Sequence, residues 1–219
     1  MVTEIELKAH VRYSEALKKL LSQKAEFKGA FEKQDVYWFA PETSVLPVKK
    51  LRVRREKRSF ADGTEKSICL ATYKSKEENN GIEFNDELEF EVKPVEEFEE
   101  FLMKSGLREG ATKRKRGWVF SKAVSPVAGS TAAELTAELV EVEGLGWFVE
   151  LEICVKACGD GVNAGLDEVN AEDKREETFS KAREALLAFL DDLGIERQAI
   201  ERRFYLDMLA STDYGGKGN

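Results

Sequence analysis

The feature that most constrains the fold of this chain is an alternation of charged and apolar residues with a period of two. Residues 4–12 read EIELKAHVR, and the same alternation returns at 51–54, 87–92 and 149–153. Because successive side chains of a β-strand point to opposite faces, each of these segments is predicted to be a strand with one apolar and one charged face.

Further strands are expected at 26–39, 67–76, 113–121 and 135–142. About eight strands, mostly in adjacent pairs, favour an antiparallel meander. Helical periodicity separates some of them, and the first helix is expected to be capped by Ser14. The remaining helices are predicted at 95–104, 172–193 and 200–209.

The domain organisation follows from the absence of any clear linker or internal repeat. We expect residues 1–210 to form a single domain and residues 211–219 to be a mobile C-terminal tail. The Gly-, Ser- and Ala-rich segments 125–133 and 158–170 are predicted to be loops.

Composition excludes several classes of protein. The 219 residues carry 34 Lys and Arg against 42 Asp and Glu, a net charge of −8, which disfavours a protein that coats nucleic acid. No apolar run approaches the ~18 residues of a membrane span, and the N-terminus has no hydrophobic signal core. Three cysteines without paired spacing fit a reducing cytoplasm. We therefore expect a cytoplasmic protein without nucleic-acid or membrane partners.

The charged faces are sorted by strand, which an open, solvated sheet does not require. Three strands carry Glu-x-Glu, a fourth carries Arg-x-Arg and a fifth carries Lys-x-Lys. A solvated sheet is the simpler interpretation, but a closed barrel would place these charges in one lumen with the apolar faces outward under helices, packing Ile5, Leu7, Val53, Leu88, Phe90 and Leu151.

Such a lumen would suit a metal and a polyphosphate together. Carboxylates two residues apart on one strand face can share a hard cation such as Mg²⁺ or Mn²⁺. Lysines and arginines opposite them would bind phosphate oxygens, with arginine acting as a bidentate fork.

Seven segments, in order, resemble the CYTH superfamily of triphosphate tunnel metalloenzymes. Residues 4–8 (EIELK) resemble its ExExK signature, and the other segments are 34–41 (QDVYWFAP), 51–55 (LRVRR), 72–74 (TYK), 87–89 (ELE), 144–152 (GLGWFVELE) and 203–209 (RFYLDML). The last segment is similar to the closing segment of the class IV adenylyl cyclase branch. Coverage is about residues 3–209.

The resemblance implies an α+β fold, a closed antiparallel eight-stranded β-barrel or tunnel with helices packed outside. It implies metal ligands at Glu4, Glu6, Glu150 and Glu152, and catalytic, phosphate-binding side chains at Lys8, Arg52, Arg54 and Lys74. Lys76, Lys113, Lys115, Glu87 and Glu89 are the further candidates for substrate binding.

Two positions leave alternatives open. The family usually has an Asp where this chain has Val140, and Glu138 on the same strand face could substitute for it. Residues 113–116 (KRKR) offer two faces; because Trp118 and Phe120 should pack outward, we expect Lys113 and Lys115, rather than the two arginines, in the lumen.

The resemblance favours a class IV adenylyl cyclase-like enzyme that converts ATP to cyclic AMP and pyrophosphate with Mg²⁺ or Mn²⁺. The alternatives are a metal-dependent triphosphatase, acting on inorganic tripolyphosphate, thiamine triphosphate or nucleoside triphosphates, and a non-catalytic polyphosphate- or nucleotide-binding module. Cyclase and triphosphatase would use the same lumen and differ in which phosphorus lies in line with the nucleophile. The expected partner is a small-molecule triphosphate, and the oligomeric state, including a homodimer, stays open.

Overall fold

A computed structural model of the chain describes residues 2–41, 50–79, 82–124, 133–156 and 168–215. The elements in chain order are β1 (Val2–His10), α1 (Ser14–Lys24), β2 (Glu26–Phe39), β3 (Lys50–Phe60), β4 (Glu65–Asn79), β5 (Ile82–Glu91), α2 (Val95–Lys104), β6 (Arg108–Val124), β7 (Ala133–Val142), β8 (Gly146–Lys156), α3 (Glu168–Asp192), η1 (Arg197–Ala199) and α4 (Tyr205–Gly215).

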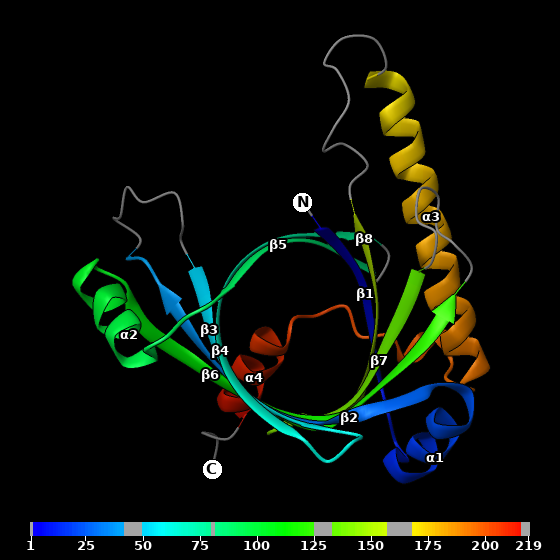
Figure 1. The fold of residues 1–219 in the computed structure, drawn as a ribbon, viewed down its shortest axis with the longest axis horizontal. Coiled ribbons are helices and arrows are strands. Elements are labelled where there is room, and N and C mark those ends of the chain that lie inside the picture. The colour runs from blue at the N-terminus through cyan, green and yellow to red at the C-terminus, as the bar shows by residue number, and fades with distance from the viewer. Residues whose placement is uncertain (1, 42–49, 80–81, 125–132, 157–167, 216–219) are drawn as a thin grey trace.

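The strands curl around a central lumen, with α1, α2 and α3 on the outside (Figure 1). Their hydrogen-bonded order is β1-β5-β4-β3-β2-β6-β7-β8, and every adjacent pair is antiparallel. β1 pairs with β8 along its whole length, whereas its ladder with β5 joins only Thr3–Glu6 to Glu83–Asp86. The ring therefore returns to its first strand through a short ladder.

Close approach of neighbouring strands requires glycine at two positions. A Cβ on Gly117 of β6 would lie 2.1 Å from the carbonyl oxygen of Leu139 on β7. Gly29 of β2 has a φ of 144° and lies at a register shift against β6, and a Cβ there would lie 2.2 Å from the carbonyl oxygen of Ser59. Glycine at such positions allows a sheet to bend tightly.

The apolar faces of the strands form the core on the outer side of the ring. Ile5 and Leu151 are buried against Leu186 and Leu190 of α3, and Leu21 of α1 belongs to the same cluster. A second outer cluster joins Val36, Trp38 and Val53 to Leu102 of α2. Burying these side chains is what holds the helices to the strands.

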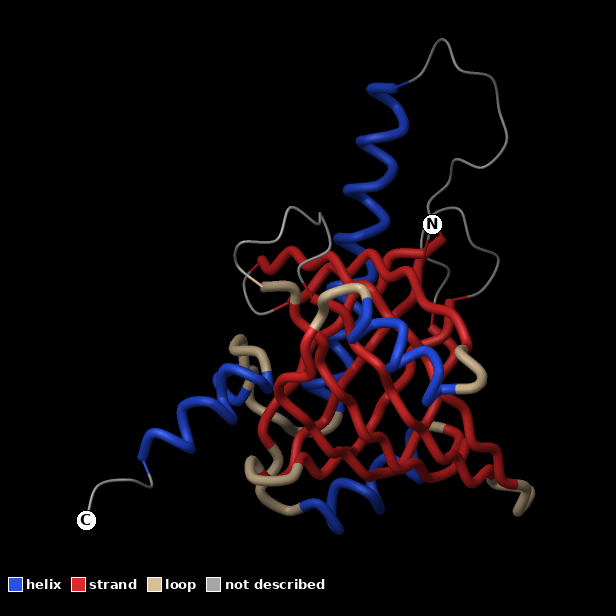
Figure 2. The backbone as a smooth tube through the Cα atoms, turned by 90° about the vertical axis from the view of Figure 1, so that its left-hand side faces the viewer, coloured by secondary structure: helices blue, strands red, loops and turns tan. Residues whose placement is uncertain are grey.

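A third apolar cluster lies on the lumenal side, where α4 meets the strands. Val140 and Phe148 share a face with the lumenal residues of β7 and β8, and they pack against Tyr205 and Met208 of α4. Figure 2 shows the far end of α4 extending away from the strands. The first turn of this helix therefore limits the lumen on one side.

The predicted α+β fold with antiparallel strands and outer helices is confirmed, and three local expectations need correction. Leu88 and Phe90 are exposed on the outer face of β5: α3 contacts this face at Phe84 and α2 contacts Phe90 edge-on, and neither helix buries the two side chains. Ser14 is the first residue of α1 rather than its cap, and the capping residue, Tyr13, makes no side-chain cap hydrogen bond. α3 begins at Glu168 rather than near residue 172.

The predictions for the C-terminal tail and for two loops fall only partly on residues that the structure describes. α4 continues to Gly215, so the described part of the expected tail is helical, and residues 216–219 lie outside the described residues, as do 125–132 and 157–167. None of the described helices combines the length and the hydropathy that a membrane-spanning segment needs.

Candidate active site

The lumen contains a cavity of about 720 Å³ whose described walls are strongly charged. Nine basic side chains line it: Lys8, Lys28, Lys33, Lys50, Arg52, Arg54, Arg58, Lys113 and Lys115. Seven acidic side chains line it as well: Glu4, Glu6, Glu83, Glu89, Glu138, Glu150 and Glu152.

These charges divide the ring into two walls. All seven acidic residues lie on β7, β8, β1 and β5, which are contiguous in the strand order. Eight of the nine basic residues lie on β3, β2 and β6, which are also contiguous, and Lys8 on β1 is the exception. We call these the acidic wall and the basic wall.

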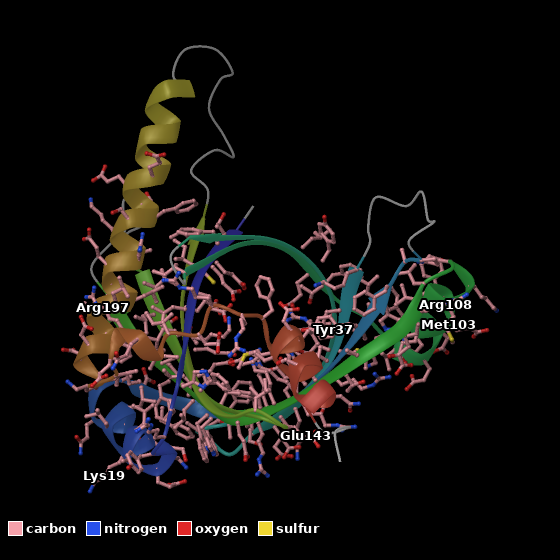
Figure 3. All side chains as sticks on the ribbon, turned by 180° about the vertical axis from the view of Figure 1, so that it is seen from behind. Lys19, Tyr37, Met103, Arg108, Glu143 and Arg197 are labelled. Atoms are coloured by element: carbon pink, nitrogen blue, oxygen red, sulfur yellow. The ribbon has the colours of Figure 1, made fainter. Side chains whose placement is uncertain are left out.

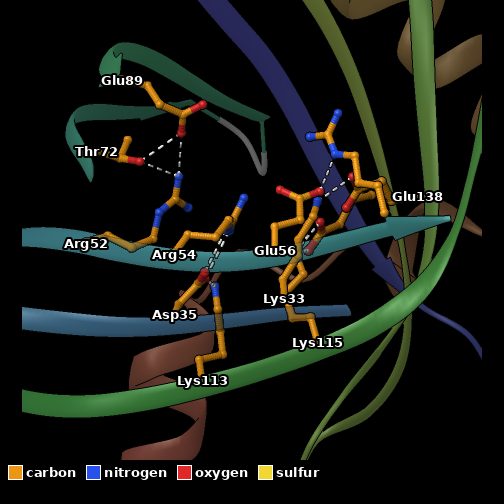
Figure 4. Close-up of polar contacts among 12 residues, drawn as sticks. Lys33, Asp35, Arg52, Arg54, Glu56, Thr72, Glu89, Lys113, Lys115 and Glu138 are labelled. Atoms are coloured by element: carbon orange, nitrogen blue, oxygen red, sulfur yellow. Dashed lines mark hydrogen bonds and ion pairs between the residues drawn. The ribbon is translucent and has the colours of Figure 1, made fainter. Parts of the chain in front are cut away.

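The basic wall is organised around Asp35, a carboxylate that does not itself line the cavity. Arg54 donates from Nε to Asp35 Oδ1 (2.6 Å) and from Nη2 to Oδ2 (3.0 Å), and Lys113 Nζ lies 3.1 Å from Oδ2 (Figure 4). Burial alone would raise the pKa of Asp35, but Arg54 and Lys113 hold it well below its usual range. Asp35 is therefore a fixed negative charge behind two cations.

Arg52 lies at the edge of the basic wall and makes a different set of contacts. Its Nη2 donates to Thr72 Oγ1 (3.1 Å) and lies 3.4 Å from Glu89 Oε2, and Thr72 in turn donates to Glu89 (2.8 Å) (Figure 4). The sequence predicts that both Arg52 and Arg54 offer a bidentate fork to phosphate. In Arg54, Asp35 occupies the Nε and Nη2 edge, so a fork to phosphate would use the Nη1 and Nη2 end.

Two buried lysines link the basic wall to the acidic wall. Lys33 donates to Glu138 (2.6 Å), and Lys115 donates to both carboxylate oxygens of Glu150 (2.8 and 2.6 Å). Burial lowers the pKa of Lys33, which Glu138 only partly offsets. Burial would also lower the pKa of Lys115, but Glu150 and Glu138 raise it, and Lys115 correspondingly lowers that of Glu150.

The predicted metal ligands do not all have the same surroundings. Glu6 and Glu152 are directly paired across β1 and β8, and a carboxylate oxygen of Glu4 lies within 4.8 Å of ligand atoms of Glu152 and Cys154. Glu150 is instead engaged by Lys115. Oxygen ligands converging at one edge of the cavity fit a hard divalent cation, so Glu4, Glu6 and Glu152 are the residues that suit one best.

The start of α4 brings aromatic rings into the lumen. Tyr205 lies with its ring centroid 5.6 Å from Lys8 Nζ, 5.3 Å from Lys113 Nζ and 5.5 Å from Lys115 Nζ. Burial, and then the neighbouring Glu150, raises the pKa of Tyr205 well above its usual value. A neutral phenol therefore sits among three ammonium groups, and Lys8 is further paired with Glu83 (2.6 Å).

The strand faces assign the remaining predicted residues. Lys113 and Lys115 are buried in the lumen, whereas Arg114 and Arg116 are exposed on the outer face and contact Glu143 and Glu141. The side chains of Lys74, Lys76 and Glu87 lie outside the described residues. Their backbones lie in β4 and β5, where Lys74 pairs with Glu87 and Lys76 with Asn85.

The position where the family has an Asp is apolar in this chain. Val140 is fully buried beside Phe148, Tyr205 and Met208. Glu138, two residues earlier on the same face, lines the cavity and holds Lys33.

Sequence reasoning assigned no role to Lys33, Asp35, Tyr37, Arg58 or Glu83, which the fold brings to the lumen. The alternating run Lys33, Asp35, Tyr37 on β2 carried the signal, since all three share one strand face. Tyr37 lies toward the interior in Figure 3, whereas Lys19 and Arg197 lie at the periphery. Burial would raise the pKa of Tyr37, but Lys113 and Arg52 hold it below its ordinary value.

No protein-family model and no curated protein matches this chain. Solved structures do share its fold. The PH1012 protein of Pyrococcus horikoshii has a TM-score of 0.61 at 22% identity, covering 93% of this chain and 98% of that one. A Vibrio parahaemolyticus protein proposed to be an adenylate cyclase has a TM-score of 0.58 at 15% identity, covering 94% and 97%.

The Hippeastrum protein HpAC1, a proposed adenylyl cyclase for which a dominant triphosphatase activity is described, has a TM-score of 0.57 at 15% identity, covering 97% of this chain and 96% of that one. At these identities the similarities show that the chain shares the fold of these proteins.

Proposed function

We propose that this chain is a metal-dependent enzyme that cleaves small-molecule triphosphates inside the lumen, and that its principal reaction is hydrolysis of the terminal phosphate. The observation that carries the proposal is the division of the cavity into a basic and an acidic wall. A triphosphate and a divalent cation have opposite charges and need opposite partners, and the two walls supply these around one cavity of about 720 Å³.

In this proposal the basic wall holds the phosphate chain. Arg52, Arg54, Lys113 and Lys115 would bind its oxygens, together with Lys8, Lys33, Lys74 and Lys76, while Glu87 and Glu89 would orient the basic groups. Fixing the chain between these groups would place the terminal phosphorus in line with an attacking water, whose bond to phosphorus forms as the phosphoanhydride bond breaks.

Glu4, Glu6 and Glu152 would hold Mg²⁺ or Mn²⁺, which would lower the pKa of the attacking water and neutralise charge on the phosphate oxygens. Glu150 would join them only if Lys115 moved from it to the phosphate, since Lys115 engages both of its oxygens. Tyr205 and the cluster around Val140 limit the lumen on the other side and would keep bulk water away from the phosphate chain.

Cyclisation of ATP, the reaction that the sequence favours, is the second candidate. Two cyclase-like segments, 35–41 and 205–209, place Tyr37 and Tyr205 in the cavity wall and Asp35 behind Arg54. Against this stands Val140: if the family's Asp helps to orient the ribose 3′-hydroxyl for attack on the α-phosphorus, an apolar residue at that position impairs cyclisation more than hydrolysis. This difference is why hydrolysis comes first in the proposal.

The test is a product assay on the purified protein with tripolyphosphate and with ATP, each with Mg²⁺, Mn²⁺ or excess EDTA. We expect metal-dependent release of phosphate from tripolyphosphate. Cyclic AMP and pyrophosphate from ATP, without phosphate release, would promote the cyclase. Binding of both compounds without any product would leave only the non-catalytic binding module.

A further inference from the structure

Asp35 is the most completely enclosed charge of the basic wall. Its side chain is 0% exposed, and it lies on β2 directly opposite Arg54 on β3 and Lys113 on β6. One carboxylate therefore contacts cations from both neighbouring strands. It does not line the cavity, so it cannot itself meet a substrate there.

The contacts of Asp35 determine which donors of the two cations remain for a ligand. Asp35 takes the Nε–H and one Nη2–H of Arg54, so the two N–H groups of Nη1 and the second one of Nη2 are the donors without a hydrogen bond among the described residues. It also takes one direction around the Lys113 ammonium, at 3.1 Å. Both side chains are left with a fixed orientation and with donors still available on the cavity side, since both line the cavity.

The neighbouring residue on β3 provides a comparison inside the same strand. Arg55 points to the outer face and makes an equally regular bidentate pair with Glu99 of α2, with both N···O distances at 2.8 Å. That pair joins a helix to the sheet and borders no part of the lumen. The Arg55–Glu99 pair therefore serves as an internal control: it has the same two-point geometry but only joins a helix to the sheet.

We infer that Asp35 is a positioning residue of the phosphate-binding wall, which fixes Arg54 and Lys113 so that Arg54 presents its Nη1 and Nη2 end, rather than its Nε and Nη2 edge, to the phosphate chain. This inference rests on the proposed function, because it takes the ligand of the lumen to be a polyphosphate. It adds that substrate affinity depends on a carboxylate that never touches the substrate.

The experiment measures binding of tripolyphosphate in EDTA by calorimetry, so that no turnover occurs. The variants are Asp35→Glu, which keeps the charge and displaces the carboxylate by one methylene, and Asp35→Asn, which removes the charge. Glu99→Asp and Glu99→Gln are the matched changes in the outer pair. Circular dichroism and thermal unfolding check that each variant is folded.

Misplacing a charge-assisted donor commonly weakens binding about tenfold or more. We expect that loss in Asp35→Glu and Asp35→Asn, and wild-type binding within about twofold in both Glu99 variants. Steady-state assays should show the same loss as a raised KM with kcat less affected, since the wall holds the phosphate chain in the ground state and the transition state alike. Equal binding by wild type and Asp35→Glu would overturn the inference, as would an equal loss in the Glu99 variants.

Failure of the proposed function gives a different result, namely no tripolyphosphate binding by the wild type itself. If neither Asp35 variant folds, an NMR measurement on the wild type tests the inference instead. The Arg54 Nε–H resonance, assigned by its disappearance in Arg54→Lys, should persist with unchanged solvent protection when tripolyphosphate is added. Its loss or rapid exchange would mean that phosphate displaces Asp35, which contradicts the inference.

Discussion

Arg54 and Arg55 are neighbours on β3, carry the same side chain and each form a two-point ion pair, yet they belong to different environments. Arg54 and Asp35 face the lumen at 12% and 0% exposure, whereas Arg55 and Glu99 lie on the outer face at 38% and 19%. The two pairs have nearly the same geometry. The two pairs differ in solvation, because the charges of the lumenal pair are more deeply buried than those of the outer pair.

That difference decides what each pair can do. An exposed ion pair contributes little to stability because water already solvates both charges. A buried pair contributes little net stability either, because desolvation offsets the attraction, but removing one partner leaves a charge with neither water nor counterion. The lumen is lined with such charges, so a ligand that arrives with the opposite charge gains much more there than on the outer face.

The largest effect is expected for the stability of Asp35→Asn. This change leaves Arg54 and Lys113 charged and buried, so the free energy of unfolding should fall by about 3–5 kcal/mol. Glu99→Gln in the outer pair should cost at most about 1 kcal/mol. Urea unfolding at neutral pH measures both. Similar losses at the two positions would show that burial does not distinguish the pairs.

The difference in stability between wild type and Asp35→Asn should depend on pH. The pKa of Asp35 is depressed in the folded protein, so its contribution is fully present above the unfolded value of about 3.9 and is lost as the pH falls through the folded value. The stability gap between wild type and Asp35→Asn should therefore narrow below about pH 4, by up to about 1.4 kcal/mol per pH unit. Unfolding midpoints at pH 7, 5, 4 and 3 test this, and a constant gap would contradict it.

The sequence predicts which face of a strand each side chain lies on, but not which residues of the neighbouring strands lie opposite it. Trp118 and Phe120 are apolar and share one parity, which correctly turns Lys113 and Lys115 inward. Alternation fixes a face because the period is two, but it does not fix the register between strands. The register is what places Asp35 opposite Arg54, and a single sequence gave no means to derive it.

The same limit explains why the acidic residues were treated as equivalent. Glu150 and Glu152 share a strand face, yet only Glu150 meets Lys115, because Lys115 reaches it from a strand two positions away in the ring. Leu88 shows a second limit. Its parity is outward as predicted, but whether a helix covers an outward face depends on where the helix packs.

On the acidic wall, Glu6→Gln should leave the fold intact and remove a charge that the proposed metal requires. Metal-dependent phosphate release should fall on the order of 10²-fold. Glu32→Gln, on the exposed outer side of β2, is the control and should leave the rate unchanged. Full activity of Glu6→Gln at saturating Mn²⁺ would mean that Glu6 is not a metal ligand.

On the basic wall, Arg52→Lys keeps the charge but loses the planar fork, so kcat/KM for tripolyphosphate should fall about tenfold. Arg55→Lys makes the same change on the outer face of β3 and should alter kcat/KM by less than about twofold. The pair of variants separates geometry from charge, because both keep a cation. Unchanged kinetics in Arg52→Lys would place Arg52 outside the binding site.

The smallest effect is expected on the outer face of β5. Leu88 is 64% exposed, so Leu88→Ser removes little buried area and should change the free energy of unfolding by less than about 0.5 kcal/mol. The same substitution at Leu7, which is buried in the outer core, is the positive control for lost packing.

Leu88 lies directly opposite Tyr73 and near Phe90, and both of these are also exposed, although Phe98 of α2 meets Phe90 edge-on, so this face carries several apolar side chains that the neighbouring helix does not bury. If a second copy of the chain covers this face in solution, Leu88→Ser will cost more than 1 kcal/mol, roughly what loss of a buried contact costs, and the cost will grow with protein concentration. A small effect that is independent of concentration shows instead that the outer face of β5 is exposed in the working protein.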